Sequence, residues 1–219
     1  VQPADRDSME FTVMSYRPYD GAPLTGYTNE TYGFAQSLMM DDIAALHYLY
    51  GADYGADAGD TTYTFSATTG EMFVDGVGQG TPGANRIFRT LWDGNGNDTY
   101  DLSNYSTPLD IDLTPGRWST FSDAQRANLG NGNQARANLY NAKIVGEDTR
   151  SLIENAIGGS SDDTLIGNRK GNRLEGGSGK DWLFGAGGRD TIFGGEGDDL
   201  IYGDDAPEET NTTSGIELG

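Results

Sequence analysis

Residues 158–202, read in rows of nine, are GGSSDDTLI, GNRKGNRLE, GGSGKDWLF, GAGGRDTIF and GGEGDDLIY. Every row begins with Gly at position 1. Position 6 is Asp in four rows and Asn in the second row, and position 8 is always Leu or Ile. The pattern G-G-x-G-x-D-x-U-x, in which U is apolar, is the nonapeptide repeat of parallel β-helices. Five rows in register therefore predict a solenoid rather than a disordered glycine-rich linker.

The composition of each row predicts a turn over its first six residues and a short strand over its last three. Glycine tolerates the positive φ angles that curl a turn until its carbonyl oxygens point inward. The carboxylate at position 6 adds further oxygen atoms to that ring. Because Ca²⁺ takes about six to eight oxygen ligands in a flexible arrangement, we expect the turns to bind calcium.

One row makes half a coil, so rows two apart are expected to stack. This places Asp163, Asp181 and Asp199 at one edge and Asn172 and Asp190 at the other. The second row has basic residues at positions 3 and 4 and lacks the Asp, so we expect its calcium site to be weak or absent. The candidate calcium ligands of the repeat are Gly159, Ser161, Asp163, Gly176, Gly177, Ser178, Gly179, Asp181, Gly185, Ala186, Gly187, Gly188, Asp190, Gly194, Gly195, Glu196, Gly197 and Asp199.

The composition restricts the possible partners. The 219 residues carry a formal net charge of −20, which favours cations and argues against nucleic acid or anionic membranes. The chain has no Cys, so calcium is expected to take the stabilising part that disulfides play in other secreted proteins. We expect no membrane-spanning segment and no amino-terminal signal peptide.

Outside the repeat, hydrophobic periodicity predicts one helix and several strands. The helix is expected from Ser37, as its cap, to Tyr50, and residues 122–132 suggest a second, short helix. Residues 206–219 are expected to be disordered. The strands are expected at 10–13, 63–65, 87–92, 99–102, 110–113, 139–145 and 152–157.

Four segments resemble one family. FTVMSY at 11–16 resembles the Met-turn of metzincin metallopeptidases. Residues 39–52 resemble the helix that closes the catalytic domain of serralysins, and TLWDGNGNDTYD at 90–101 and IENAIGG at 153–159 are similar to serralysin segments. The set follows the family's order over nearly the whole chain, so the chain resembles the carboxyl-terminal part of a serralysin-type secreted zinc metalloprotease.

The resemblance implies a mainly β fold. A parallel β-roll, the calcium-binding solenoid called RTX, would follow the remnant of a metzincin catalytic domain with one helix. The implied divisions are residues 1–52 for the remnant, 53–205 for the β-roll domain and 206–219 for a disordered tail. The resemblance also implies an extracellular protein exported by a bacterial type I system.

The implied activity is peptide-bond hydrolysis in the intact protein, with protein or peptide substrates. Met14 would be the hydrophobic floor beneath the zinc, and Tyr16 would ligate zinc or stabilise the transition state. The family's zinc motif, H-E-x-x-H-x-x-G-x-x-H, is absent, and the single His47 follows the Met-turn. We therefore expect this chain to be inactive alone and to hold Zn²⁺ only together with a missing amino-terminal catalytic fragment.

The resemblance further implies two calcium sites before the repeat. The first would use the carbonyls of Asp57, Gly59 and Thr61 with Asp93, Asn95 and Asp98. The second would use Gly96, Asp98, Leu152 and Glu154. The alternative for Asp93 and Asp98 is an ordinary Asx-turn.

A second function stays open. The chain could be a non-enzymatic extracellular calcium-binding RTX module that serves secretion or adhesion. Such a module has no use for the segment Met14–Tyr16 or for the helix after it, and these two features favour the protease.

Overall fold

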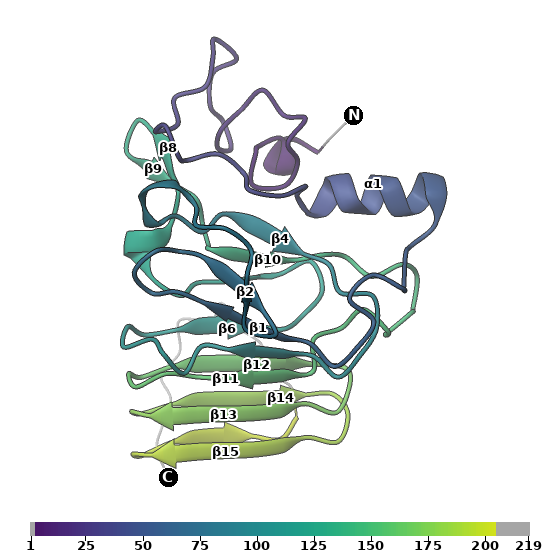
Figure 1. The fold of residues 1–219 in the computed structure, drawn as a ribbon, viewed down its shortest axis with the longest axis vertical. Coiled ribbons are helices and arrows are strands. Elements are labelled where there is room, and N and C mark those ends of the chain that lie inside the picture. Colours follow the sequence, from purple (N-terminus) through teal and green to yellow (C-terminus); the bar gives the residue numbers. More distant parts are fainter. Residues whose placement is uncertain (1–2, 205–219) are drawn as a thin grey trace, which may run out of the picture.

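The computed structural model describes residues 3–204, and the predicted tail at 206–219 lies outside them. The fold is mainly β, with a single α-helix, α1 (Met40–Tyr50), among the described residues. The repeat forms a stack of strands at one end of the molecule, and α1 and the amino-terminal segment lie at the other end (Figure 1).

The repeat alternates between two parallel sheets. One sheet has the order β16-β14-β12-β6, with bounds Leu200–Tyr202, Trp182–Ala186, Thr164–Asn168 and Asp110–Asp112. The other contains β15, β13, β11 and β5, with bounds Thr191–Glu196, Arg173–Ser178, Asn155–Ile157 and Thr99–Asp101. Strands two rows apart are therefore hydrogen-bonded neighbours, which is the topology expected of a parallel β-roll.

The position-8 side chains set the register and fill the core. Leu165 is opposite Leu183, which in turn is opposite Ile201. Leu174 in the other sheet is opposite Ile192. The first three of the five rows bury this side chain completely, whereas Ile201 in the last row is 46% exposed. One apolar residue in every nine therefore suffices to hold the two sheets together.

Earlier strands extend the sheet that contains β5 toward the amino end. β1 (Thr62–Phe65) pairs in parallel with β5 and antiparallel with β2 (Met72–Val74), and β3 (Val77–Gly78) follows at the edge. Tyr63 and Tyr100 are buried in the same core as the position-8 residues. The hydrophobic core is thus continuous from β1 into the repeat.

A second core joins the amino-terminal segment to a small sheet. This sheet has the order β4-β10-β7, with bounds Arg89–Leu91, Leu139–Asn141 and Trp118–Ser119. Phe11, Met39 and Met40 pack with Phe88 and Tyr140 in this core. A hairpin of β8 (Asn128–Gly130) and β9 (Asn133–Gln134) lies beside it, and short 3₁₀ helices occupy Ala4–Arg6, Gly83–Asn85 and Asp123–Gln125.

The predicted helix begins two residues too early, because its cap is Met39 rather than Ser37. Ser37 does not cap α1, because its hydroxyl donates to the Thr90 carbonyl and accepts from the Thr90 N–H. Met39 is the cap residue, and the Asp42 carboxylate closes the first turn by accepting from the Met39 N–H. The competing hydrogen bonds to β4 therefore move the helix start to Met40.

Two other local predictions need correction. Residues 10–13 form turns rather than a strand, because Glu10 is held by Arg136, which lies between β9 and β10, and by Tyr140 of the small sheet. The short helix predicted within 122–132 is only the 3₁₀ turn Asp123–Gln125, followed by β8. The strands predicted at 87–92, 139–145 and 152–157 are present but shorter, as β4, β10 and β11.

Candidate metal-binding sites

The position-6 side chains link each row to the row two before it. The Asp163 N–H donates to Oδ1 of Asp181 at 2.9 Å, and the Asp181 N–H donates to Oδ1 of Asp199 at 3.0 Å. At the other edge the Asn172 N–H donates to Oδ1 of Asp190 at 2.9 Å. The predicted division of these five residues between two edges is therefore confirmed.

The position-1 glycines face pairs of oxygen atoms. A Cβ added to Gly176 would come within 3.0 Å of both Oδ2 of Asp181 and the Gly194 carbonyl oxygen. The same pairing of a row's own position-6 side chain with a carbonyl two rows later recurs at the position-1 glycines Gly158, Gly167 and Gly185. Each of the first four rows thus leaves a cradle that only glycine permits and that two oxygen atoms line.

Two buried carboxylate oxygens have no hydrogen-bond partner within the described residues: Oδ2 of Asp98 and Oδ2 of Asp181. A buried acceptor without a partner is costly, and a cation would satisfy it. Residues 3–204 contain no group of three or more His, Cys, Asp or Glu side chains placed to hold a metal ion. Any ion here would need backbone carbonyls among its ligands, which is the donor set that Ca²⁺ accepts.

The turns of the last three rows have the curled backbone that the sequence predicted. Gly179, Gly188 and Gly197, all at position 4, have φ angles of 130°, 108° and 130°. Position 2 of the same rows is also left-handed, at Gly177, Ala186 and Gly195, with φ angles of 107°, 64° and 112°. The turns of the first two rows have no residue in this region. The rows at 176–202 therefore fit calcium better than the rows at 158–175.

The first row uses its predicted ligands in hydrogen bonds. Oδ2 of Asp163 accepts from the Gly159 N–H at 2.6 Å, and Oδ1 accepts from the Leu109 N–H at 2.8 Å. The Ser161 hydroxyl donates to the Ser106 carbonyl. Among the other candidate carbonyls, those of Gly159 and Glu196 already accept N–H groups from Ser178 and Gly179.

The predicted upstream site brings most of its members together. The Thr61 N–H donates to Oδ1 of Asp98 at 2.9 Å, and the Thr61 hydroxyl reaches the carbonyls of Gly59 at 3.0 Å and Asp57 at 3.4 Å. Gly96 faces both Oδ1 of Asp98 and the Gly59 carbonyl oxygen. Oδ1 of Asp98 is therefore the centre of this cluster, and Oδ2 of the same carboxylate is the oxygen without a partner within the described residues.

Asp93 is bonded differently. Its Oδ2 accepts from the Tyr63 hydroxyl at 2.7 Å, and its Oδ1 accepts from the Asn95 N–H at 3.0 Å, as in an Asx-turn. Asn95 itself is exposed. Nothing in the sequence indicated the Tyr63 contact, because 30 residues separate the two side chains.

The second upstream site includes a residue that the sequence did not place there. Oε2 of Glu154 accepts from the Asp98 N–H at 2.8 Å. Leu152, which precedes Glu154 closely in the sequence, is buried. The other Glu154 oxygen forms an ion pair with the Lys170 ammonium. Lys170, the basic residue at position 4 of row two, was visible in the sequence, but the sequence did not show that Glu154 is its partner.

Burial makes these carboxyl groups hard to ionise. It raises the pKa of Asp98 to about 7, and the neighbouring Asp93 and Glu154 carboxylates add to the rise despite the Thr61 hydrogen bond. Burial likewise raises the pKa of Asp163 to about 6 and raises the pKa of Asp181. Carboxyl groups whose charge is disfavoured in this way gain most from a bound cation.

The candidate catalytic residues are exposed and do not form a complete site. Met14 is 77% exposed and Tyr16 is 74% exposed. The ring of His47, on α1, lies 4.1 Å from the ring of Trp92, and burial lowers the His47 pKa. His47 thus packs on an aromatic side chain. A sequence with one His does not fit the predicted zinc site by itself.

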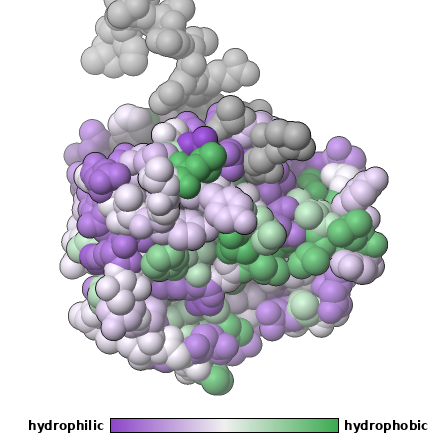
Figure 2. Space-filling view, turned by 90° about the horizontal axis from the view of Figure 1, so that it is seen from above, coloured by the Kyte–Doolittle hydropathy of each residue, from purple (hydrophilic) through white to green (hydrophobic). Residues whose placement is uncertain are grey.

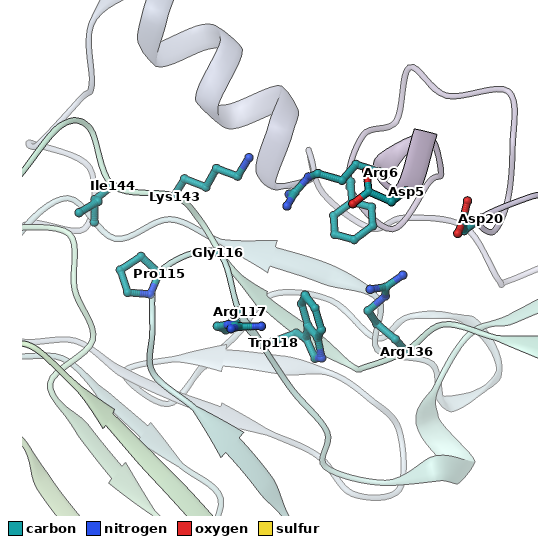
Figure 3. A pocket seen from close by; sticks show the side chains of 11 residues that line it. Asp5, Arg6, Asp20, Pro115, Gly116, Arg117, Trp118, Arg136, Lys143 and Ile144 are labelled. Carbon is teal, nitrogen blue, oxygen red and sulfur yellow. The ribbon is translucent and has the colours of Figure 1, made fainter. Parts of the chain in front are cut away.

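A groove of about 690 Å³ lies between the amino-terminal segment and the small sheet (Figure 3). Arg136 lies over the rings of Phe11 and Trp118, at 4.7 and 5.0 Å from their centroids. Its guanidinium also pairs with Glu10, and Lys143 pairs with Asp41 of α1. These contacts attach the amino-terminal segment and α1 to the small sheet and to the chain next to it.

Comparison with known proteins identifies the class. Residues 52–213 match the family model described as Peptidase M10 serralysin C terminal. The chain is 35% identical over 170 residues to metallopeptidase AprA of Pseudomonas marginalis, 36% over 171 residues to serralysin G of Dickeya chrysanthemi and 35% over 170 residues to serralysin of Proteus mirabilis. These alignments cover 78%, 77% and 77% of the chain, but only 31%, 30% and 29% of the relatives.

The chain therefore belongs to the serralysin carboxyl-terminal family, as its sequence motifs predicted. It spans less than a third of the length of these curated relatives. No helix among residues 3–204 is both long and apolar enough to cross a membrane.

Proposed function

We propose that this chain is the calcium-binding β-roll portion of a secreted, serralysin-like zinc metalloendopeptidase, which hydrolyses peptide bonds in the intact protein. The observation that carries the calcium role is the repeated oxygen cradle with its unpartnered Asp98 and Asp181 oxygens. The names of the relatives, metallopeptidase and serralysin, support the protease over the non-enzymatic module.

Each cradle with Asp at position 6 would hold Ca²⁺ through that carboxylate and glycine carbonyls. The ion would neutralise carboxylates whose charge burial disfavours, so binding and folding are coupled. In this proposal residues 53–205 are the calcium-dependent domain and residues 1–52 belong to the catalytic domain. A chain of this charge would stay loose where calcium is scarce and become ordered outside the cell.

The exposed apolar side chains around α1 support a larger catalytic domain. Leu46, Tyr48, Leu49 and Tyr50 on α1 are 41–89% exposed. Figure 2, which looks onto the end of the molecule opposite the last coil, shows green apolar patches between polar residues. Together with Met14 and Tyr16, these side chains would pack against the zinc-binding part of the protease.

A calcium titration followed by far-UV circular dichroism tests the structural role. The chain in excess EGTA is expected to keep only part of its β signal, with a measurable urea transition, and to gain the rest when Ca²⁺ is added in excess. Mg²⁺ at equal concentration is the control, because its stricter octahedral geometry does not fit carbonyl-lined turns. A fully folded chain in EGTA that does not respond to Ca²⁺ would contradict the proposal.

A casein-cleavage assay tests the enzymatic role. This chain alone is expected to be inactive. Cleavage that a zinc chelator abolishes is expected only when a polypeptide carrying H-E-x-x-H is present, and the mass and amino-terminal sequence of co-purifying polypeptides would identify it. Zinc-dependent cleavage by the isolated chain would show that the catalytic residues have been assigned wrongly.

A further inference from the structure

Row two differs from the other rows in one charged contact. Lys170 occupies position 4, where the three following rows have Gly. Its ammonium forms an ion pair with Oε1 of Glu154, whose side chain is only 5% exposed. The other Glu154 oxygen accepts the Asp98 N–H. The carboxylate that resemblance assigned to a calcium ion is therefore already neutralised by a side chain of the same protein.

The rest of the turn is closed by side-chain hydrogen bonds. Oδ1 of Asn172 accepts from the Asn168 N–H at 2.8 Å, and Nδ2 of Asn172 donates to the Glu154 carbonyl at 2.9 Å. Oδ1 of Asn168 accepts from the Lys170 N–H at 3.0 Å. Asn172 thus presents a bonded neutral amide where the other rows have a carboxylate, and the turn has no left-handed residue.

These features exclude a calcium ion on electrostatic grounds. A buried carboxylate is strongly destabilising once its only counter-charge is removed. An ammonium and a divalent cation bound to the same carboxylate would repel each other across a poorly solvated space. The residues around Glu154 therefore fit the lysine and do not fit Ca²⁺.

We propose that Lys170 is a resident cation that replaces a calcium ion at this step of the β-roll. The junction between Asp98, Glu154 and row two is then held together without calcium, while the rows from 176 onward require it. This inference rests on the proposed calcium role of the neighbouring turns. In this proposal the row-two junction is a calcium-independent part of the roll against which the calcium-dependent coils stack.

Three variants of the full chain test the inference. Lys170→Gly combined with Asn172→Asp restores the pattern of the other rows. Lys170→Met removes the ammonium but keeps most of the apolar stem, and adding Glu154→Gln to it removes both charges. Lys180→Met is the matched control, because Lys180 is exposed and lies at position 5 of the next row.

Native mass spectrometry in calcium counts the bound ions, and urea unfolding in EGTA measures the calcium-free stability. The restored row is expected to bind one Ca²⁺ more than the unmodified chain. Lys170→Met is expected to lower the urea midpoint in EGTA, and the added Glu154→Gln to recover most of that loss. Lys180→Met is expected to change neither quantity.

Two results would overturn the inference. One is an equal ion count in the unmodified chain and the restored row, and the other is a Lys170→Met midpoint equal to that of Lys180→Met. If the restored-row variant fails to fold even in calcium, the urea midpoints of Lys170→Met and of Lys170→Met with Glu154→Gln test the inference instead. An unmodified chain that binds no Ca²⁺ would instead refute the proposed function, so the two failures are distinguishable.

Discussion

Replacing Asp181 by Asn should change stability in opposite directions with and without calcium. Asp181 is completely buried, and its Oδ1 accepts the Asp163 N–H at 2.9 Å while its Oδ2 has no partner within residues 3–204. Burial and the nearby Asp199 and Asp162 carboxylates raise its pKa. The substitution keeps the first hydrogen bond and exchanges the unpartnered charged oxygen for an NH₂ group.

Without calcium the variant should be the more stable protein. An unsatisfied buried acceptor costs about 1–3 kcal/mol, and more when it is charged. The new NH₂ group would lie beside the Gly194 carbonyl oxygen, which faces the same glycine cradle as the lost oxygen. We therefore expect Asp181→Asn to raise the free energy of unfolding in EGTA by about 1–2 kcal/mol.

With calcium the order should reverse. A ligand at about 100 times its Kd stabilises the folded state by about 2.7 kcal/mol, and each tenfold loss of affinity removes about 1.4 kcal/mol of this. Loss of a charged ligand is expected to weaken the site by about a hundredfold, which removes about 2.3 kcal/mol at this Ca²⁺ concentration and outweighs the gain of about 1–2 kcal/mol in EGTA. At a Ca²⁺ concentration that saturates the unmodified chain, the variant should therefore have the lower free energy of unfolding.

Urea unfolding at several calcium concentrations, followed by Trp fluorescence, measures both effects. Asp198→Asn is the matched control, since Asp198 is exposed at position 5 of the last row and loses the same charge. An equal change in the free energy of unfolding of Asp181→Asn in EGTA and in calcium would refute the reasoning. It would show that the Asp181 carboxylate is not a calcium ligand.

Three further predictions follow from backbone geometry and from protonation. Ala186→Gly should stabilise the chain by about 0.5–1 kcal/mol in chemical denaturation, because Ala186 has a φ of 64°, which costs a residue with a Cβ. Gly176→Ala should destabilise it by about 1–3 kcal/mol, because its Cβ would overlap two oxygen atoms, whereas Gly203→Ala, which meets nothing within 4 Å, should be near neutral. Raised carboxyl pKa values stabilise the calcium-free folded state below the unfolded value of about 4, and this contribution is lost as the pH rises through about 6 for Asp163 and about 7 for Asp98. Calcium affinity measured by titration calorimetry should consequently fall as the pH drops from 8 to 5, and a pH-independent affinity would contradict these assignments.

The regular part of the fold could be predicted from the sequence because each structural role in the repeat is filled by one type of residue at a fixed position. A Leu or Ile at every position 8 is needed to fill the core, and this fixed the register of Leu165, Leu174 and Leu183. The two edges of position-6 side chains followed from the same period. The repetition strengthened these predictions, because the same pattern recurs in every row.

The errors arise where distant residues compete for local groups. Ser37 is a good helix cap by type, but Thr90, 53 residues away, takes its hydroxyl. Glu10 alternates with apolar neighbours as in a strand, yet Arg136 and Tyr140 determine its position. The pairing of Lys170 with Glu154 depends on the stacking of the coils, so no local pattern could show it.

The position-6 hydrogen bonds also give the repeat a direction. Each Asp in the stack accepts an N–H from a row nearer the amino end, as Asp199 does from Asp181 and Asp181 does from Asp163. Removing the last coil would leave the Asp181 N–H without its acceptor, and removing the first row would leave the Trp182 N–H without the Asp163 carbonyl. Only the side-chain bonds run in one direction, so the coil made last during synthesis completes the position-6 hydrogen bonds of the coil made before it.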